Sequence, residues 1–246
     1  MNVVNFMPWI GQDYCKVIRG FSPQAGGFPY NLPEVYSWGT KHRILMLGES
    51  VPLWSDNLLP DVMNKERDLN VLLIECRLSG KEDRRPYAAA GAVITGKYAT
   101  GMNIYREVAF ANFFQKFVGA APRGKSLITP LLIEQSCAAL DRILDVLKPS
   151  LVIVWGIGRL SADNSSGWLP CMHHLSETCR WPETLHTPPQ DTHSLQLKRP
   201  ADLNTWVYEK YPDTRFWAIE HPSFRGFSYD YWHPLFKYVL GMLPQV

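Results

Sequence analysis

The sequence predicts an α/β protein with three layers, α/β/α, around a central, four-stranded, mostly parallel sheet. Apolar runs over 42–47 and 151–155 each end at a glycine, which is typical of buried strands. A third apolar run covers 108–113, and an amphipathic stretch over 130–147 separates it from the run at 151–155. Strand, helix and strand in this order predict a right-handed crossover and therefore parallel strands.

Composition predicts a single domain over 1–246. The 246 residues suffice for one sizeable domain, and 46% of them are apolar. The N-terminus lacks the basic start and apolar run of a signal peptide, and no stretch of about 18 apolar residues predicts a membrane span. Five scattered cysteines without a Cys-x-x-Cys pair indicate reduced thiols. We therefore expect a cytoplasmic protein with no membrane partner.

The N-terminal part is predicted to contain a cover, a strand, a helix and a loop, in that order. Residues 1–40 are rich in proline, glycine and aromatic residues and predict an irregular N-terminal cover. The strand at 42–47 follows, and apolar spacing predicts a helix over 60–78. Residues 79–104 carry four glycines and several basic side chains, and are predicted to be loop.

The helix predicted over 130–147 has the clearest local signals. Thr129 is a suitable N-cap, Pro130 occupies the first helical position, and Glu134 lies early in the helix. Apolar residues repeat at spacings of three and four along one face, and Lys148-Pro149 ends the helix.

The C-terminal part is predicted to hold an insertion, a hairpin and a closing helix. Residues 158–205 contain many prolines and polar residues and predict an insertion of loops and short elements. Pro212-Asp213 lies between two apolar segments and predicts a hairpin turn. A closing helix is predicted over 231–243, with its start limited by Pro234.

Polar side chains follow three of the predicted strands. Gly48-Glu49-Ser50 follows the first strand, Asn112 ends the second, and His221-Pro222-Ser223 follows the last. Ligands of open parallel sheets bind outside the carboxyl ends of the strands, so we expect these groups to meet. A carboxylate, an amide and an imidazole form a chemically sensible set for a nucleobase.

These motifs, in this order, resemble the uracil-DNA glycosylase superfamily from about residue 42 to 232, with the insertion unmatched. Gly48-Glu49-Ser50-Val51-Pro52 is similar to its water-activating loop. The stretch 109–160 follows its middle segment, and His221-Pro222-Ser223 resembles the turn that presents a histidine to a flipped base. The resemblance implies a single uracil-DNA glycosylase-like domain that needs no cofactor and takes DNA as its partner.

The resemblance also implies roles for individual residues. Glu49 would orient water and His221 would stabilise the leaving base, which makes them the catalytic candidates. Base binding would fall to Gly48, Ser50, Asn112 and Phe113, with Asn112 contacting the base edge. Trp54, Phe113 and Phe114 are alternatives for the ring that stacks on the base. DNA contacts would come from Arg123, Lys125, Ser223, Phe224 and Arg225, and the turn 224–227 would fill the gap in the duplex.

Each of these residues also has a purely structural interpretation. Glu49 could cap a helix, Asn112 could bond to backbone, and His221 could be a satisfied turn histidine. The aromatic rings of the 224–227 turn could pack in the core.

Two departures from the superfamily bear on the substrate. Ser50 stands where the best-known members carry aspartate, so a carboxylate role rests on Glu49. Pro52 stands where an aromatic ring excludes 5-substituted pyrimidines, which suggests a modified cytosine of viral DNA as substrate.

We expect no metal and no iron–sulfur cluster. Cysteine and histidine residues crowd residues 171–193, but their spacing is not that of a usual zinc finger or ribbon. The cysteine spacing likewise does not support a cluster.

Three functions fit these observations. The first is a monofunctional DNA glycosylase acting on a flipped uracil or modified pyrimidine, in repair or in antiviral defence. The second is a catalytically inactive member of the same fold that binds nucleic acid or protein, which the altered first motif and the net charge of +2 favour. The third is hydrolysis of a free nucleoside or nucleotide.

Overall fold

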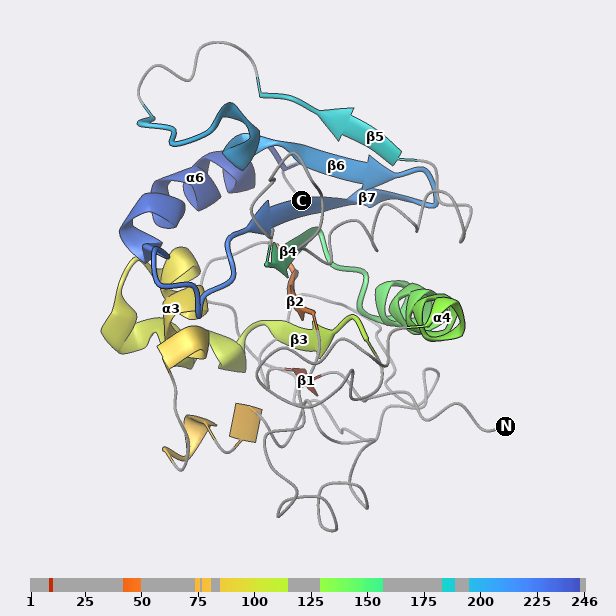
Figure 1. The fold of residues 1–246 in the computed structure, drawn as a ribbon, viewed down its shortest axis with the longest axis horizontal. Coiled ribbons are helices and arrows are strands. Elements are labelled where there is room, and N and C mark those ends of the chain that lie inside the picture. Colours follow the sequence, from red (N-terminus) through yellow and green to blue (C-terminus); the bar gives the residue numbers. More distant parts are fainter. Residues whose placement is uncertain are drawn as a thin grey trace.

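The computed structural model shows one mixed sheet between two helical layers (Figure 1). It describes residues 9–10, 42–49, 74–75, 77–80, 85–114, 129–156, 183–188 and 195–243. The strands are β1 (Trp9–Ile10), β2 (Ile44–Gly48), β3 (Ala109–Asn112), β4 (Leu151–Trp155), β5 (Glu183–His186), β6 (Thr205–Tyr208) and β7 (Tyr211–Ile219). The helices are α3 (Arg85–Thr95), α4 (Pro130–Leu147) and α6 (Tyr229–Gly241), with 3₁₀ helices η5 (Tyr98–Arg106) and η6 (Pro200–Leu203).

The strand order is β1-β3-β2-β4-β7-β6-β5. The four central strands, β3, β2, β4 and β7, pair in parallel. Strand β1 is antiparallel to β3, and β6 and β5 continue the other side as antiparallel strands. The predicted α/β class is confirmed, but the sheet formed by the described strands is wider than the four strands expected.

Helices cover both faces of the sheet, with α4 on one face and α3 and α6 on the other (Figure 1). Alternate residues of each central strand enter different cores: Leu45 and Leu47 pack on the α4 side, and Ile44 and Met46 on the α3/α6 side. Because both faces are covered, β2 and β4 are apolar without interruption, as parallel strands usually are.

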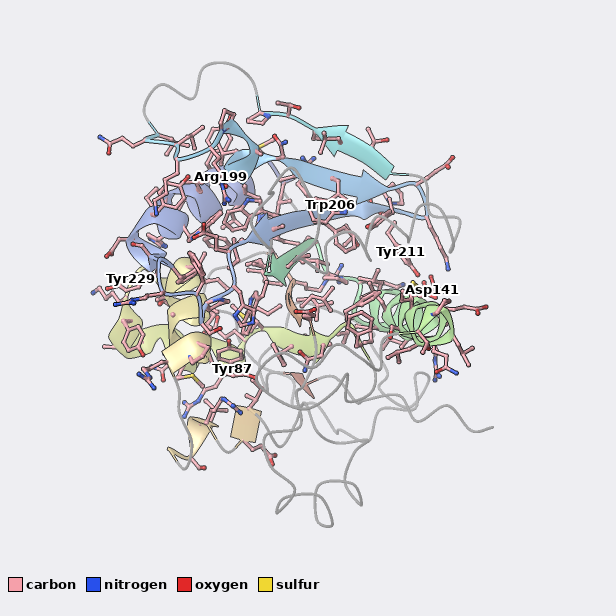
Figure 2. All side chains as sticks on the ribbon, in the orientation of Figure 1. Tyr87, Asp141, Arg199, Trp206, Tyr211 and Tyr229 are labelled. Atoms are coloured by element: carbon pink, nitrogen blue, oxygen red, sulfur yellow. The ribbon has the colours of Figure 1, made fainter. Side chains whose placement is uncertain are left out.

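Helix α4 spans the predicted residues, and the residues expected to start and end it do so. The Thr129 side chain accepts a hydrogen bond from the Leu132 backbone N–H at 3.2 Å. Pro130 is at the start of the helix, and Lys148 ends it in the left-handed conformation, with φ of 43°. At its far side α4 meets the β6–β7 turn, where the Tyr211 hydroxyl donates to Asp141 Oδ1 at 2.5 Å (Figure 2).

The prediction of a loop over 79–104 is wrong, because this stretch contains α3 and most of η5. Gly91 and Gly101 serve close packing, whereas Gly80 and Gly96 follow helical segments with φ of 81° and 71°. A Cβ atom added to Gly91 would lie 1.8 Å from the Gly101 carbonyl oxygen, and one added to Gly101 would lie 2.0 Å from the Ala88 carbonyl oxygen. The two helices therefore touch through their backbones.

Two C-terminal predictions need correction. The β6–β7 hairpin forms, but it turns at Glu209 and Lys210, and Pro212 and Asp213 lie inside β7. The β6–β7 register shifts there, so the missing N–H of Pro212 falls where the ladder is interrupted. Helix α6 starts at Tyr229 and runs through Pro234, because the buried face that packs it continues on both sides of the proline.

Several predictions lie outside the described residues. They include the N-terminal cover over 1–40, apart from β1, and the helix over 60–78, apart from helical residues at 74–75 and 77–78. The described part of the 158–205 insertion contains β5 and η6. None of the described helices is long and apolar enough to cross a membrane.

Replacing Gly91 with alanine is expected to lower the free energy of unfolding by about 1–3 kcal/mol, the usual cost of overpacking. The melting temperature would fall by about 2–4 °C per kcal/mol. Gly241→Ala is the matched control, because nothing lies within 4 Å of the added Cβ. Equal melting temperatures for the two variants would contradict the close α3–η5 contact.

Candidate functional site

The ends of β2 and β3 bring Glu49 next to Asn112. Gly48 pairs with Asn112 in the parallel register. The ladder continues beyond the strands, because the Phe113 N–H donates to the Gly48 carbonyl at 2.8 Å and the Phe114 N–H donates to the Glu49 carbonyl at 2.9 Å. The backbone of Glu49 is thus fixed beside Asn112, and its side chain is half-buried.

Gly48 leaves room for the Asn112 amide. A Cβ atom at Gly48 would lie 2.5 Å from Asn112 Oδ1, which is closer than any real contact. Asn112 is 4% exposed, so its side chain has little freedom to move away. The position of this amide therefore depends on the absence of a side chain at residue 48.

Phe113 lies in the core. It is fully buried, with its ring perpendicular to that of Phe114 at 5.1 Å, and both belong to the cluster under α4. This burial favours packing over stacking on a ligand for both rings. Trp54, the third stacking candidate, lies outside the described residues.

The end of β7 brings His221 onto the end of β4. The Gly156 N–H donates to the Ile219 carbonyl at 3.0 Å, which holds the two strand ends together. The His221 ring is perpendicular to the Trp155 indole, with centroids 6.4 Å apart. Trp155 in turn packs edge-on against Tyr87, which Figure 2 labels, at 5.5 Å. The His221 ring therefore packs against Trp155, which in turn packs against Tyr87.

Ser223 fixes the hydrogen-bonding roles of the His221 ring. Its backbone N–H donates to His221 Nδ1 at 3.2 Å, and its hydroxyl oxygen lies 2.7 Å from the same nitrogen. Because a backbone N–H can only donate, Nδ1 is an acceptor and the proton of the neutral ring lies on Nε2. In this tautomer the ring N–H lies on Nε2.

Two successive turns follow His221. The Phe224 N–H donates to the His221 carbonyl at 2.8 Å, and the Phe227 N–H donates to the Phe224 carbonyl at 3.0 Å. Phe224 is 44% exposed and Arg225 is exposed beside it, whereas Phe227 packs against the α3/α6 core. Of the two aromatic rings, that of Phe224 is the more exposed.

Like Trp54, the candidates Ser50, Pro52, Arg123 and Lys125 lie outside the described residues. So do Cys171, His173, His174, Cys179 and His193 of the cysteine- and histidine-rich region. Among the residues that the structure describes, no group of three His, Cys, Asp or Glu side chains could hold a metal ion.

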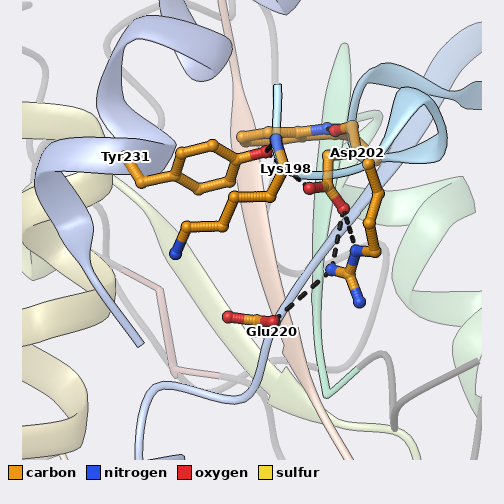
Figure 3. A network of polar contacts seen from close by, with 6 residues as sticks. Lys198, Asp202, Glu220 and Tyr231 are labelled. Carbon is orange, nitrogen blue, oxygen red and sulfur yellow. Dashed lines mark hydrogen bonds and ion pairs between the residues drawn. The ribbon is translucent and has the colours of Figure 1, made fainter. Parts of the chain in front are cut away.

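A polar network around Asp202, which includes Glu220, was not predicted from the sequence (Figure 3). The Asp202 carboxylate is 2% exposed and accepts from Arg199 Nε at 2.8 Å and from the Tyr231 hydroxyl at 2.5 Å. Arg199 also lies 3.5 Å from the Glu220 carboxylate, which directly precedes His221. The spacing of Arg199 and Asp202 in η6 was the only local signal, since Tyr231 and Glu220 are distant in sequence.

Comparisons with family models, with curated proteins and with solved structures find no match to this chain. The function proposed below therefore rests on the motifs and on the geometry of the strand ends.

A double-mutant cycle tests the Gly48–Asn112 contact. Gly48→Ala is expected to lower the free energy of unfolding by about 1–3 kcal/mol, because the new methyl group overlaps the amide oxygen. In an Asn112→Ala background the same substitution should cost less, with a coupling of about 1 kcal/mol. Urea denaturation of the four proteins measures this coupling, and additive costs would show that the residues do not touch.

The Tyr231–Asp202 bond predicts a loss of stability at alkaline pH. Burial, and then the hydrogen bond to Asp202, raise the pKa of Tyr231 above its ordinary value of 10.0. The unfolded tyrosine ionises first, so the stabilisation is complete below pH 10 and falls as pH rises, by up to about 1.4 kcal/mol per pH unit. In Tyr231→Phe, the free energy of unfolding measured by urea denaturation should fall less steeply as the pH rises above 10. An unchanged slope would contradict the assignment.

Proposed function

We propose that this protein is a monofunctional DNA glycosylase that hydrolyses the N-glycosidic bond of a flipped uracil or modified pyrimidine. Four parallel central strands with helices on both faces are what the resemblance to the uracil-DNA glycosylase superfamily predicts, and they support this assignment. The observation that carries the proposal is the placement of His221, with its Nδ1 contacting Ser223, at the same sheet edge as Glu49 and Asn112.

The reaction needs a group that stabilises the departing base. When the bond from sugar C1′ to the base nitrogen breaks, its electron pair goes to the base, and negative charge develops on a carbonyl oxygen. The Nε2–H of His221 would donate to that oxygen. One such donor typically accelerates the reaction by about 10²–10³-fold. Because Ser223 and the Trp155 ring orient the imidazole before the substrate binds, little reorganisation is required.

The reaction also needs a negatively charged group near the sugar. Loss of the base leaves positive charge shared between C1′ and the ring oxygen, and the Glu49 carboxylate would stabilise it. Glu49 would also orient a water molecule and accept its proton as the water oxygen bonds to C1′. The products are the free base and an abasic site, and no electrons are exchanged with a cofactor.

Asn112 supplies base selectivity in this proposal. Its amide offers both a donor and an acceptor, so it would pair with two adjacent polar atoms on one base edge. The amide is nearly buried and is held over Gly48, so its orientation is set before binding. Admission of a substituent at the pyrimidine C5 would depend on Pro52 and its surroundings.

The 224–227 turn is the proposed contact to the duplex. Extruding a base costs a few kcal/mol. The exposed ring of Phe224 would fill the space that the base leaves, and Arg225 would bind a neighbouring phosphate. Arg123 and Lys125 would add further phosphate contacts.

Excision assays test the proposal directly. Oligonucleotides carrying uracil, hypoxanthine or 5-modified cytosines would be incubated with the protein, and abasic sites cleaved with alkali. We expect strand cleavage for at least one of the pyrimidines, with rates about 100-fold lower in Glu49→Gln and in His221→Ala. His186→Ala and Glu209→Gln are matched controls outside the site and should retain activity.

The other outcomes identify the alternatives. Cleavage unaffected by the Glu49 and His221 substitutions would contradict the assigned site. No cleavage, together with DNA binding in a mobility-shift assay, would favour the inactive binding member of the fold. Release of base from free nucleosides alone would favour a nucleoside hydrolase.

A further inference from the structure

The His221 loop, defined as residues 221–228, connects β7 to α6 and is held at both ends by the same polar network. Glu220 precedes the loop, and Tyr231 lies in the first turn of α6, just after it. Both side chains reach Arg199 or Asp202, which come from a third segment, at η6 (Figure 3). The segment at η6 therefore spans the two ends of the loop.

The inner half of the network is rigid. Asp202 is buried and ties Arg199 to Tyr231 through its two carboxylate oxygens. Its backbone carbonyl accepts from the buried Trp217 indole N–H at 2.8 Å, which anchors η6 to the middle of β7. The Tyr231 hydroxyl also accepts from the Lys198 backbone N–H at 2.9 Å. Arg199 is thus bound to the buried Asp202 on one side and contacts Glu220 on the other.

The outer half of the network is a single ion pair. Arg199 Nη2 lies 3.5 Å from Glu220 Oε1, and the two side chains are 32% and 19% exposed. Glu220 is the last residue before His221, so this ion pair links the start of the loop to Arg199. Within the loop, backbone hydrogen bonds form the turns at Phe224 and Phe227, and Ser223 contacts the His221 ring.

We propose that Arg199 and Glu220 are positioning residues that hold the start of the His221 loop and so keep the His221 ring on its Ser223 and Trp155 contacts, with Asp202 and Tyr231 as their support. The inference rests on the proposed function, since it makes this ion pair a determinant of the catalytic rate. Arg199 and Glu220 act through the loop and need not touch the substrate. Loss of the pair frees the start of the loop, and the Ser223 contacts that hold the His221 tautomer weaken with it.

The choice of variant matters, because removing a partner of buried Asp202 would leave its charge uncompensated and could unfold the protein. Glu220→Gln removes the outer charge and keeps the size of the side chain. Arg199→Lys keeps the charge but loses the planar fork that binds both carboxylates. Lys210→Gln is the matched control, because Lys210 forms a partly exposed ion pair with Asp141 at the far end of β7.

The first readout needs no substrate. Amide hydrogen exchange would be measured at Ser223, Phe224 and Phe227, whose N–H groups hold the two turns. Glu220→Gln and Arg199→Lys should speed this exchange about twofold to fivefold, the change expected from losing a partly exposed ion pair. Nitrogen-15 NMR of the His221 ring should show the Nε2–H tautomer dominant in the parent protein and less so in both variants. Lys210→Gln should change neither.

The second readout is kinetic. With the base that the parent protein excises, both variants should lower kcat about twofold to fivefold, because fewer molecules hold His221 in place. KM should change less than kcat, since Arg199 and Glu220 do not contact the base. The melting temperature of Glu220→Gln should match that of Lys210→Gln.

The outcomes separate this inference from the proposed function. Unchanged exchange and an unchanged His221 tautomer in Glu220→Gln would overturn the positioning role, whatever the activity. Altered exchange with an unaltered kcat would also overturn it, because the loop would then move without consequence. If the parent protein excises no base, the glycosylase proposal fails, while the exchange and NMR data still decide whether the ion pair orients the ring.

Discussion

The parallel ladder through β3, β2, β4 and β7 is the constraint on which the structure depends. Parallel strands point the same way, so their carboxyl ends meet at one edge. Helices cover both faces, so the buried stretches of these strands are apolar and polar groups gather at the strand ends. Glu49, Asn112 and His221 are polar residues at three such ends, and the ladder bonds beyond Gly48 and at Gly156 keep those ends aligned.

Sequence reasoning succeeded where the determining interactions are local. Helix α4 was predicted with its true bounds because its cap at Thr129, its first-turn proline and its apolar period all act within a few residues. It failed over 79–104 because glycine has two uses. A glycine that ends a helix and one that lets two helices touch look alike in sequence, and only the approach of Gly91 to Gly101 distinguishes them. The hairpin turn was misplaced at Pro212 for a similar reason. A proline can lie inside β7 because the β6–β7 register shifts there, and the sequence does not reveal that shift.

The candidate site, like the fold, was predictable only where local sequence determines it. The strand-end positions of Glu49, Asn112 and His221 follow from the order of strands along the chain. Phe113 shows the limit, because whether a strand-end ring faces a ligand or the core depends on the helix packed against it. The network around Asp202 carried almost no local signal, since its contact with Tyr231 joins residues 29 positions apart and requires the folded loop.

The contact between Gly48 and Asn112 has a consequence for how such a chain can diverge. The amide occupies the volume that any side chain at residue 48 would need. A lineage that enlarges residue 48 must first shorten or redirect residue 112, the amide that we propose contacts the base. The two positions are therefore expected to change together as the chain diverges.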